Sequence, residues 1–157
     1  MRAGARTPWL VLGIGLGGFV DGIVLHQVLQ WHHLVSASTP PATLDALERN
    51  TLADGFFHAA TWVTVLAGVL GLAAAWRSGA APVGRRAQAG LLLAGWGLFD
   101  LVEGVVDHHL LQVHHVRDDL GGPLSWDLGF LALGLAQLVA GLLLARTDRQ
   151  PTRVRGG

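Results

Sequence analysis

The chain alternates between long apolar stretches and short polar connections. Each stretch reaches the length of about 20 residues that a helix needs to cross a bilayer, and together they cover residues 9–31, 51–76, 87–113 and 126–145. A soluble helix would show polar positions every third or fourth residue, and segments such as WVTVLAGVLGLAAAW show none. Because backbone groups in lipid must pair within the segment, the pattern predicts four transmembrane helices. The polar segment 43–50 is expected to form a separate short surface helix.

The polar residues at the ends of the first and third stretches form a repeat. The sequence DGIVLHQVLQWHH at 21–33 returns as EGVVDHHLLQVHH at 103–115, and six of the eight histidines occupy equivalent positions in it. The second and fourth stretches begin with Asp54 and Asp127 at matching depths. We therefore predict an all-α, four-helix transmembrane bundle with internal parallel duplication, in which helices 1–2 are repeated as helices 3–4 about an axis along the membrane normal.

Composition narrows the classes of function. The chain has 157 residues, of which 51% are hydrophobic and only 14% charged, and 22 are glycine, which lets membrane helices approach closely. The absence of cysteine excludes disulfides and thiolate metal sites, and the single methionine disfavours a copper(I) carrier. A net charge of zero gives no support for a nucleic-acid partner. The bilayer is the expected partner, and glycine-rich faces allow a homo-oligomer or a membrane-complex partner without requiring either.

The arginines predict the orientation. Only Arg49 and Arg117 fall on one side of the four spans, and the other basic residues fall on the opposite side. The positive-inside rule therefore predicts a multi-pass protein of a bacterial inner membrane with both termini in the cytoplasm. Residues 1–146 are expected to form a single domain with an uncleaved first span, and 147–157 a disordered basic cytoplasmic tail.

Imidazoles and carboxylates recur in the outer halves of the predicted helices. Residues turn by about 100° along an α-helix, so His26, Gln30 and His33 are expected to share one face. Such donors suit zinc, iron, manganese or copper(II), although the Glu-x-x-His spacing of di-iron bundles is missing. The candidate ligands are His26, His108 and His58 for nitrogen, Asp21, Glu103 and Asp107 for oxygen, and His32, His114, His33 and His115 as further histidines.

The cost of burying charge in lipid supports a ligand role for these groups. A charged side chain near mid-bilayer costs about 2.5–3.5 kcal/mol even on lenient insertion scales, and the first and third stretches carry several carboxyl groups with no arginine at their depth. A bound cation, protonated carboxyl groups or a hydrogen-bond network with histidine would each relieve that cost. The sequence therefore predicts either a metal site or a metal-free polar network.

Two other functions are open. His26 and His108 are equivalent in the repeat, so they could be the axial ligands of a b-type haem in an electron carrier. The row Asp100, Glu103 and Asp107 resembles a proton or cation relay, but inner-half segments such as GLLLAGWG are apolar and leave such a path incomplete. A structural role is a further alternative, and no enzymatic reaction follows from these residues.

Some of the polar residues also have plainer interpretations. Thr51 with Asp54 resembles a helix capping box, and Ser125 with Asp127 allows the same interpretation. The two histidines that end each repeat, at 32–33 and 114–115, could likewise be polar residues at the membrane interface. Tryptophans at the span ends are expected at the membrane interface, and these are Trp9, Trp31, Trp76 and Trp126.

The combination of GFVDGIVLHQVLQWHH, DGFFH and FDLVEGVVDHHLLQVHH resembles a bacterial family of predicted four-span membrane proteins, the domain-of-unknown-function family 2243. The resemblance extends from residue 9 to about residue 145. It implies an integral membrane location. It implies no reaction, so it assigns no catalytic residues.

Overall fold

The computed structural model describes residues 6–146, and every regular element in that range is helical. The predicted tail at 147–157 lies outside the described residues. The elements are α1 (Arg6–Asp21), which continues as the π-helix η1 (Gly22–Val28), α2 (Leu44–Arg77), α3 (Arg85–Glu103), which continues as the π-helix η2 (Gly104–Leu110), the 3-10 turn η3 (Asp118–Leu120) and α4 (Leu124–Arg146).

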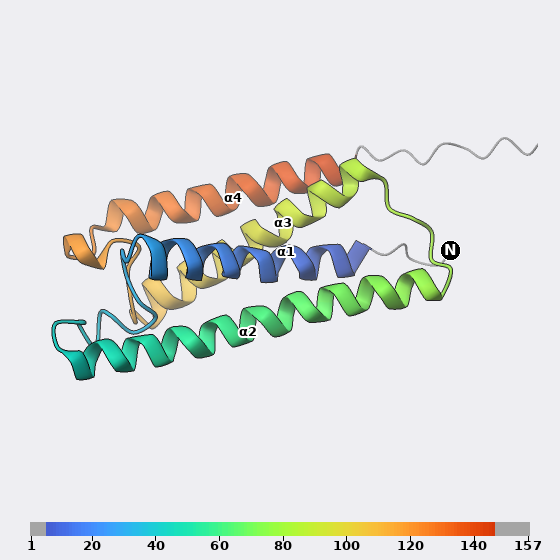
Figure 1. Ribbon diagram of the computed structural model, residues 1–157. Helices are drawn as coiled ribbons and strands as arrows, with labels where there is room; N and C mark the ends of the chain where they lie inside the picture. The colour runs from blue at the N-terminus through green and yellow to red at the C-terminus, as the bar shows by residue number, and fades with distance from the viewer. Residues whose placement is uncertain (1–5, 147–157) are drawn as a thin grey trace, which may run out of the picture.

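Helices α1 and α3 pack against each other in the middle of the molecule, and α2 and α4 flank them. Helix α2 packs on α1, and α4 packs on α3 (Figure 1). Glycines bring the central pair together: a Cβ atom at Gly13 would lie 2.9 Å from Leu92 Cα, and one at Gly95 would lie 2.8 Å from Ile14 N. The backbones of α1 and α3 therefore touch, which holds the elements that follow them close to each other.

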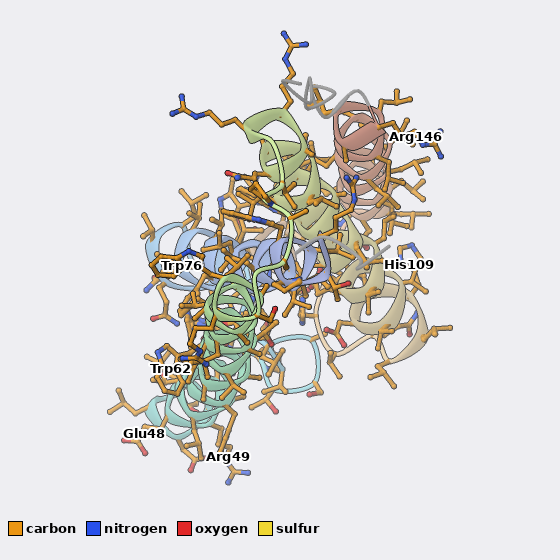
Figure 2. All side chains as sticks on the ribbon, turned by 90° about the vertical axis from the view of Figure 1, so that its right-hand side faces the viewer. Glu48, Arg49, Trp62, Trp76, His109 and Arg146 are labelled. Atoms are coloured by element: carbon orange, nitrogen blue, oxygen red, sulfur yellow. The ribbon has the colours of Figure 1, made fainter. Side chains whose placement is uncertain are left out.

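Apolar side chains cover the outside of the molecule. Trp62 and Trp76 on α2 are 56% and 85% exposed and point away from the other helices (Figure 2). At the end of the bundle where α1 and α3 finish, the buried side chains are mostly histidines and carboxylates. All four long helices have the length and hydropathy of membrane spans. An apolar exterior around a polar interior is the arrangement expected in lipid, so the protein is a four-span, all-α membrane bundle.

Three local predictions are wrong at the helix ends. The first and third spans end at Val28 and Leu110, three residues earlier than predicted. The polar segment 43–50 is not a separate helix, because α2 begins at Leu44 and runs through it. Its cap is Thr43, whose Oγ1 accepts a bond from Ala46 N at 3.2 Å. A capping role for Asp54 is therefore excluded, since it lies several turns inside α2.

The two central helices end in the same way. Each widens into a seven-residue π-helix, after which Gln30 (φ 51°) or Gln112 (φ 50°) adopts a left-handed conformation. The chain thereby turns back toward the bundle. The predicted common face of His26, Gln30 and His33 does not form, because α-helical spacing stops before Gln30. The duplication itself stays a prediction, but the two bends match position for position.

Candidate metal centre

Four buried imidazoles form a cluster at the end of the bundle where η1 and η2 lie. His26 and His108 come from the two π-helices, and His32 and His114 come from the segments after them. Ring centroids are 4.5 Å apart for His26 and His32, 4.5 Å for His32 and His114, and 4.9 Å for His108 and His114. Each of the four residues is at most 2% exposed. Of the four histidines for which a single interfacial position was an alternative, His32 and His114 are instead brought into the cluster.

His32 and His114 reach the cluster because the segments that carry them cross. His32 Nδ1 bonds to the carbonyl oxygen of Val116 at 3.0 Å, and His114 Nδ1 bonds to that of Leu34 at 3.1 Å. A carbonyl oxygen only accepts, so both Nδ1 atoms donate to it. Nε2 of His32 has no hydrogen-bond partner among the described residues, whereas Nε2 of His114 bonds to Glu103 Oε1 at 2.8 Å. Burial and the neighbouring His114 and His26 hold the pKa of His32 well below its usual value, which keeps this imidazole neutral.

Asp54 orients the first half of the cluster. Its Oδ1 accepts from His26 Nδ1 at 2.8 Å and from the backbone N–H of Leu34 at 2.8 Å, and its Oδ2 accepts from His33 Nδ1 at 2.7 Å. Gln27 Nε2 adds a bond to Oδ2 at 3.1 Å. Asp54 is 1% exposed, so it fixes both the ring of His26 and the bend after η1.

Asp127 has the corresponding place in the second half. Its Oδ2 accepts from His115 Nδ1 at 2.7 Å, and its Oδ1 accepts from Val116 N at 3.0 Å. Its Oδ1 lies 3.7 Å from His108 Nδ1, beyond hydrogen-bond distance. A positioning role for these two aspartates was not predicted from the sequence. The signal that could have indicated it is their matching depth in the two halves.

Two carboxylates face the other sides of the imidazoles. Glu103 Oε1 bonds to His114 Nε2 at 2.8 Å and lies 3.0 Å from His108 Nε2. Asp21 Oδ2 lies 3.3 Å from His26 Nε2. Glutamate is one methylene longer than aspartate, which lets Glu103 reach two rings where Asp21 reaches one. Asp21 and Glu103 thus occupy matching positions in the two halves, but their side chains differ in length.

Several atoms that line this cluster lack hydrogen-bond partners among the described residues. They are the Nε2 atoms of His26, His32 and His108, both carboxylate oxygens of Asp21, and Oε2 of Glu103. A buried polar atom without a partner costs free energy, and a buried carboxylate costs more. Among residues 6–146, the ion pairs of arginine are with exposed Asp45 and partly exposed Asp119, not with these carboxylates. Buried carboxylate oxygens and imidazole nitrogens therefore face one another in the cluster, at 3.0 Å for Glu103 and His108 and 3.3 Å for Asp21 and His26, without hydrogen-bond geometry.

Two groups of three residues have the spacing of metal ligands. One is His26, His32 and His114, and the other is Glu103, His108 and His114. Within each group the ligand atoms lie within 4.8 Å of one another, and all of these residues are buried. The groups share His114, so they form one continuous site. Its imidazole and carboxylate donors suit divalent transition metals.

The structure places the other predicted ligands outside these two groups. His58 Nδ1 bonds to the carbonyl oxygen of Asp54 at 2.7 Å, and a Cβ atom at Gly22 would lie 2.7 Å from His58 Nε2. His33 and His115 bond to the two orienting aspartates. Asp107 is only partly buried. His109, which the sequence did not single out, bonds through Nδ1 to the Gly104 carbonyl at 2.8 Å and lies on the outer side of the bundle (Figure 2).

Two of the tryptophans predicted at the interface pack against the side chain of an arginine. The guanidinium of Arg117 lies 4.4 Å from the ring centre of Trp31 and 5.0 Å from that of Trp126, and the two rings lie 5.5 Å apart. Arg117 also bonds to Asp119 through two nitrogens, at 2.7 Å and 2.8 Å. These contacts join the two halves just outside the cluster.

The comparisons with known proteins agree with this architecture. The family model described as predicted membrane protein (DUF2243) matches residues 9–148. Searches among curated proteins and among solved structures each gave no match. The family match covers all four spans and both histidine segments, so the chain belongs to the DUF2243 family of predicted membrane proteins.

Proposed function

We propose that the protein binds one or two transition-metal ions in the outer half of the bundle, through histidine and carboxylate. The observation that carries this proposal is the set of buried, unpartnered ligand atoms on His26, His32, His108, Asp21 and Glu103. Zinc, iron, manganese and copper(II) all accept this donor set. A cation would satisfy the lone pairs and neutralise the carboxylates in a single step.

The hydrogen bonds around the imidazoles support the same proposal. Histidines that ligate metals donate their second ring N–H to a carboxylate or a backbone carbonyl, which fixes the ring and its tautomer. His26 does so with Asp54, and His32 and His114 do so with backbone carbonyls. In His26 and His32 the remaining nitrogen is Nε2, which has no hydrogen-bond partner among the described residues, whereas Nε2 of His114 bonds to Glu103 Oε1. These bonds support the proposal because they fix the orientation of the three rings.

A b-type haem with axial His26 and His108 is the alternative, and the packing disfavours it. The rings of His32 and His114 lie against those of His26 and His108, at centroid distances of 4.5 Å and 4.9 Å. A porphyrin between the axial pair would have to displace them. The carboxylates of Asp21 and Glu103 beside the rings also favour a bare ion over haem.

We further propose that the site faces the outside of a bacterial inner membrane, with both termini in the cytoplasm. The support is the distribution of arginine, which favours the opposite end of the bundle. The matched bends and matched aspartate contacts support an internal duplication of the two helix pairs. Under this proposal each half supplies two of the four clustered imidazoles.

Elemental analysis of detergent-purified protein from metal-replete cells tests the metal. We expect about one or two equivalents of one transition metal, since a two-ion site is the largest that the two groups allow. The absorption spectrum should show no Soret band. The double variant His26→Ala with His108→Ala should lose the metal, whereas His109→Ala, which changes a histidine next to the cluster, should retain it.

Two outcomes would refute the proposal. One is a full metal content in the double variant, and the other is a Soret band in the wild-type protein. Where the double variant does not elute as a single species in size-exclusion chromatography, His114→Asn replaces it. The amide of asparagine takes the place of Nδ1 and keeps a donor for the Leu34 carbonyl, but the imidazole that the two groups share is removed. Retention of the metal in that variant would also refute the proposal.

A further inference from the structure

A cavity lies beside the cluster, between α1, α3 and α4. Its volume is about 370 Å³, which falls in the range of small-molecule sites. The walls are largely apolar and include Val24, Trp96, Phe130 and Leu133. Most of the residues around it belong to the membrane spans, and Val24 and Leu133 are 38% and 52% exposed on the bundle surface. In a membrane, that surface contacts lipid, so a ligand can reach the cavity from the lipid phase.

Two polar side chains in the wall have oxygen atoms without a hydrogen-bond partner among the described residues. Asp21, which is 5% exposed, has no hydrogen bond to either carboxylate oxygen, and Oε1 of Gln137 is buried and also without a partner among the described residues. Gln137 lies level with Gly97, where an added Cβ would come within 2.9 Å of Gln137 Cβ. It therefore lies about one helical turn deeper in the span than Asp100, which also lines the cavity.

The chemistry of these atoms specifies the ligand. Carboxylate and amide oxygens accept hydrogen bonds, and a wall of aromatic and aliphatic side chains takes an apolar body. We propose that this cavity binds a membrane-soluble molecule that has an apolar body and a hydroxyl group, of the alkylphenol or quinol class. The hydroxyl group donates to Asp21 or Gln137. Binding of this ligand in the cavity does not require a metal ion in the histidine cluster.

The position of Asp21 connects this cavity to the candidate metal centre. Its Oδ2 lies 3.3 Å from His26 Nε2, while the same side chain lines the cavity. A ligand hydroxyl on Asp21 would therefore lie next to the histidine cluster. The cavity thus gives a lipid-phase molecule direct access to the edge of that cluster.

Tryptophan fluorescence tests the proposal, because Trp31, Trp96 and Trp126 all line the cavity. The probes are 4-(9-bromononyl)phenol, whose bromine quenches tryptophan, and its methyl ether, which has the same body but cannot donate. Both are titrated into the full-length protein in lipid nanodiscs, with and without a metal chelator. We expect saturable quenching by the phenol and at least about tenfold weaker binding of the ether, as for one hydrogen bond to a charged or buried acceptor.

Two variants locate the binding. Gly129 lines the cavity and has nothing within 4 Å of an added Cβ, so Gly129→Leu fills the cavity without disturbing the helix contacts. It should remove the saturable quenching. Gly55→Leu is the matched control, because Gly55 is equally open but lies on α2 away from this cavity. Gln137→Leu should weaken binding of the phenol and leave the ether unchanged.

Equal affinity of the two probes would overturn the hydroxyl assignment, and saturable quenching that survives Gly129→Leu would overturn the location. Quenching that only increases linearly, as expected from probe dissolved in lipid near exposed Trp62 and Trp76, would overturn the site altogether. The metal content is read on the same samples. Loss of probe binding with the metal retained, or the reverse, separates failure of this site from failure of the metal centre.

Discussion

At the scale of single residues, the hydrogen-bond partner of one ring nitrogen decides which nitrogen of a histidine faces the cluster. Asp54 receives four hydrogen bonds and is 1% exposed, so it holds His26, His33 and the following backbone together. Its counterpart Asp127 does the same for His115 and Val116. A buried carboxylate that accepts several hydrogen bonds is held in one orientation, which is what a positioning residue for a metal ligand requires.

We predict that Asp54→Asn lowers metal affinity by about 10–100-fold without removing a ligand atom, because asparagine keeps one acceptor but weakens the hold on His26. Metal titration of the detergent-purified variant measures the change. Asp45→Asn is the control, since Asp45 is exposed and pairs only with Arg49 on α2. Wild-type affinity in Asp54→Asn would show that the His26 ring needs no such partner.

At the scale of elements, the π-helices and the bends after them bring the histidines inward. A straight α-helix through residues 26–33 would carry His32 and His33 past the end of the bundle. The chain instead leaves the helix at Val28, turns at Gln30 with φ 51° and folds back, and the second half repeats this at Gln112. The left-handed conformation is unfavourable for side chains that branch at Cβ and mild for asparagine or glycine.

Gln30→Val should therefore destabilise the protein by about 1–2 kcal/mol relative to Gln30→Asn, because valine resists the left-handed conformation. It should also reduce metal content, since His32 depends on this bend to reach the cluster. Thermal unfolding in detergent, with metal analysis of the same samples, measures both effects. Equal unfolding temperatures for the two variants would mean that this bend relaxes without cost.

At the scale of the whole molecule, the close packing of two glycine-lined helices places a polar cluster at one end of an apolar bundle. Helices α1 and α3 touch through Gly13 and Gly95, so the elements that follow them emerge side by side. The central pair carries the buried carboxylates of Asp21, Asp100 and Glu103. Helices α2 and α4 shield this pair from lipid and supply two more buried carboxylates, Asp54 and Asp127.

The proposed orientation predicts which end of the bundle is open to the outside of the cell. Because the chain has no cysteine, single cysteines report on one position each. In intact cells, a membrane-impermeant maleimide should label Ser38→Cys, in the loop near the cluster, and should leave Ser78→Cys, in the loop between α2 and α3, unlabelled. Permeabilised cells should label both. The reverse pattern would place the cluster on the cytoplasmic side.

Much of the fold could be predicted from the sequence because lipid imposes local rules. A span must be apolar for about 20 residues, so its position is visible in the pattern. All four spans were found, although the second begins at Leu44 instead of residue 51. The importance of the repeated histidines followed from the same rule, since polar groups in a span need a compensating contact. Both conclusions depend only on residues near each other in the chain.

Which atoms meet was decided by tertiary structure alone. His32 and His114 enter the cluster because each bonds to a backbone carbonyl of the other half, that of Val116 or Leu34, which lies 84 or 80 residues away in sequence. His58 was predicted as a ligand on grounds of depth, yet its ring nitrogen turns to the Asp54 carbonyl. Asp54 was interpreted as a helix-start charge, yet the real start of α2 lies at Leu44. Depth and periodicity fix where a side chain lies along one helix, whereas the pairing of ligand atoms depends on how separate segments cross, which no local pattern contains.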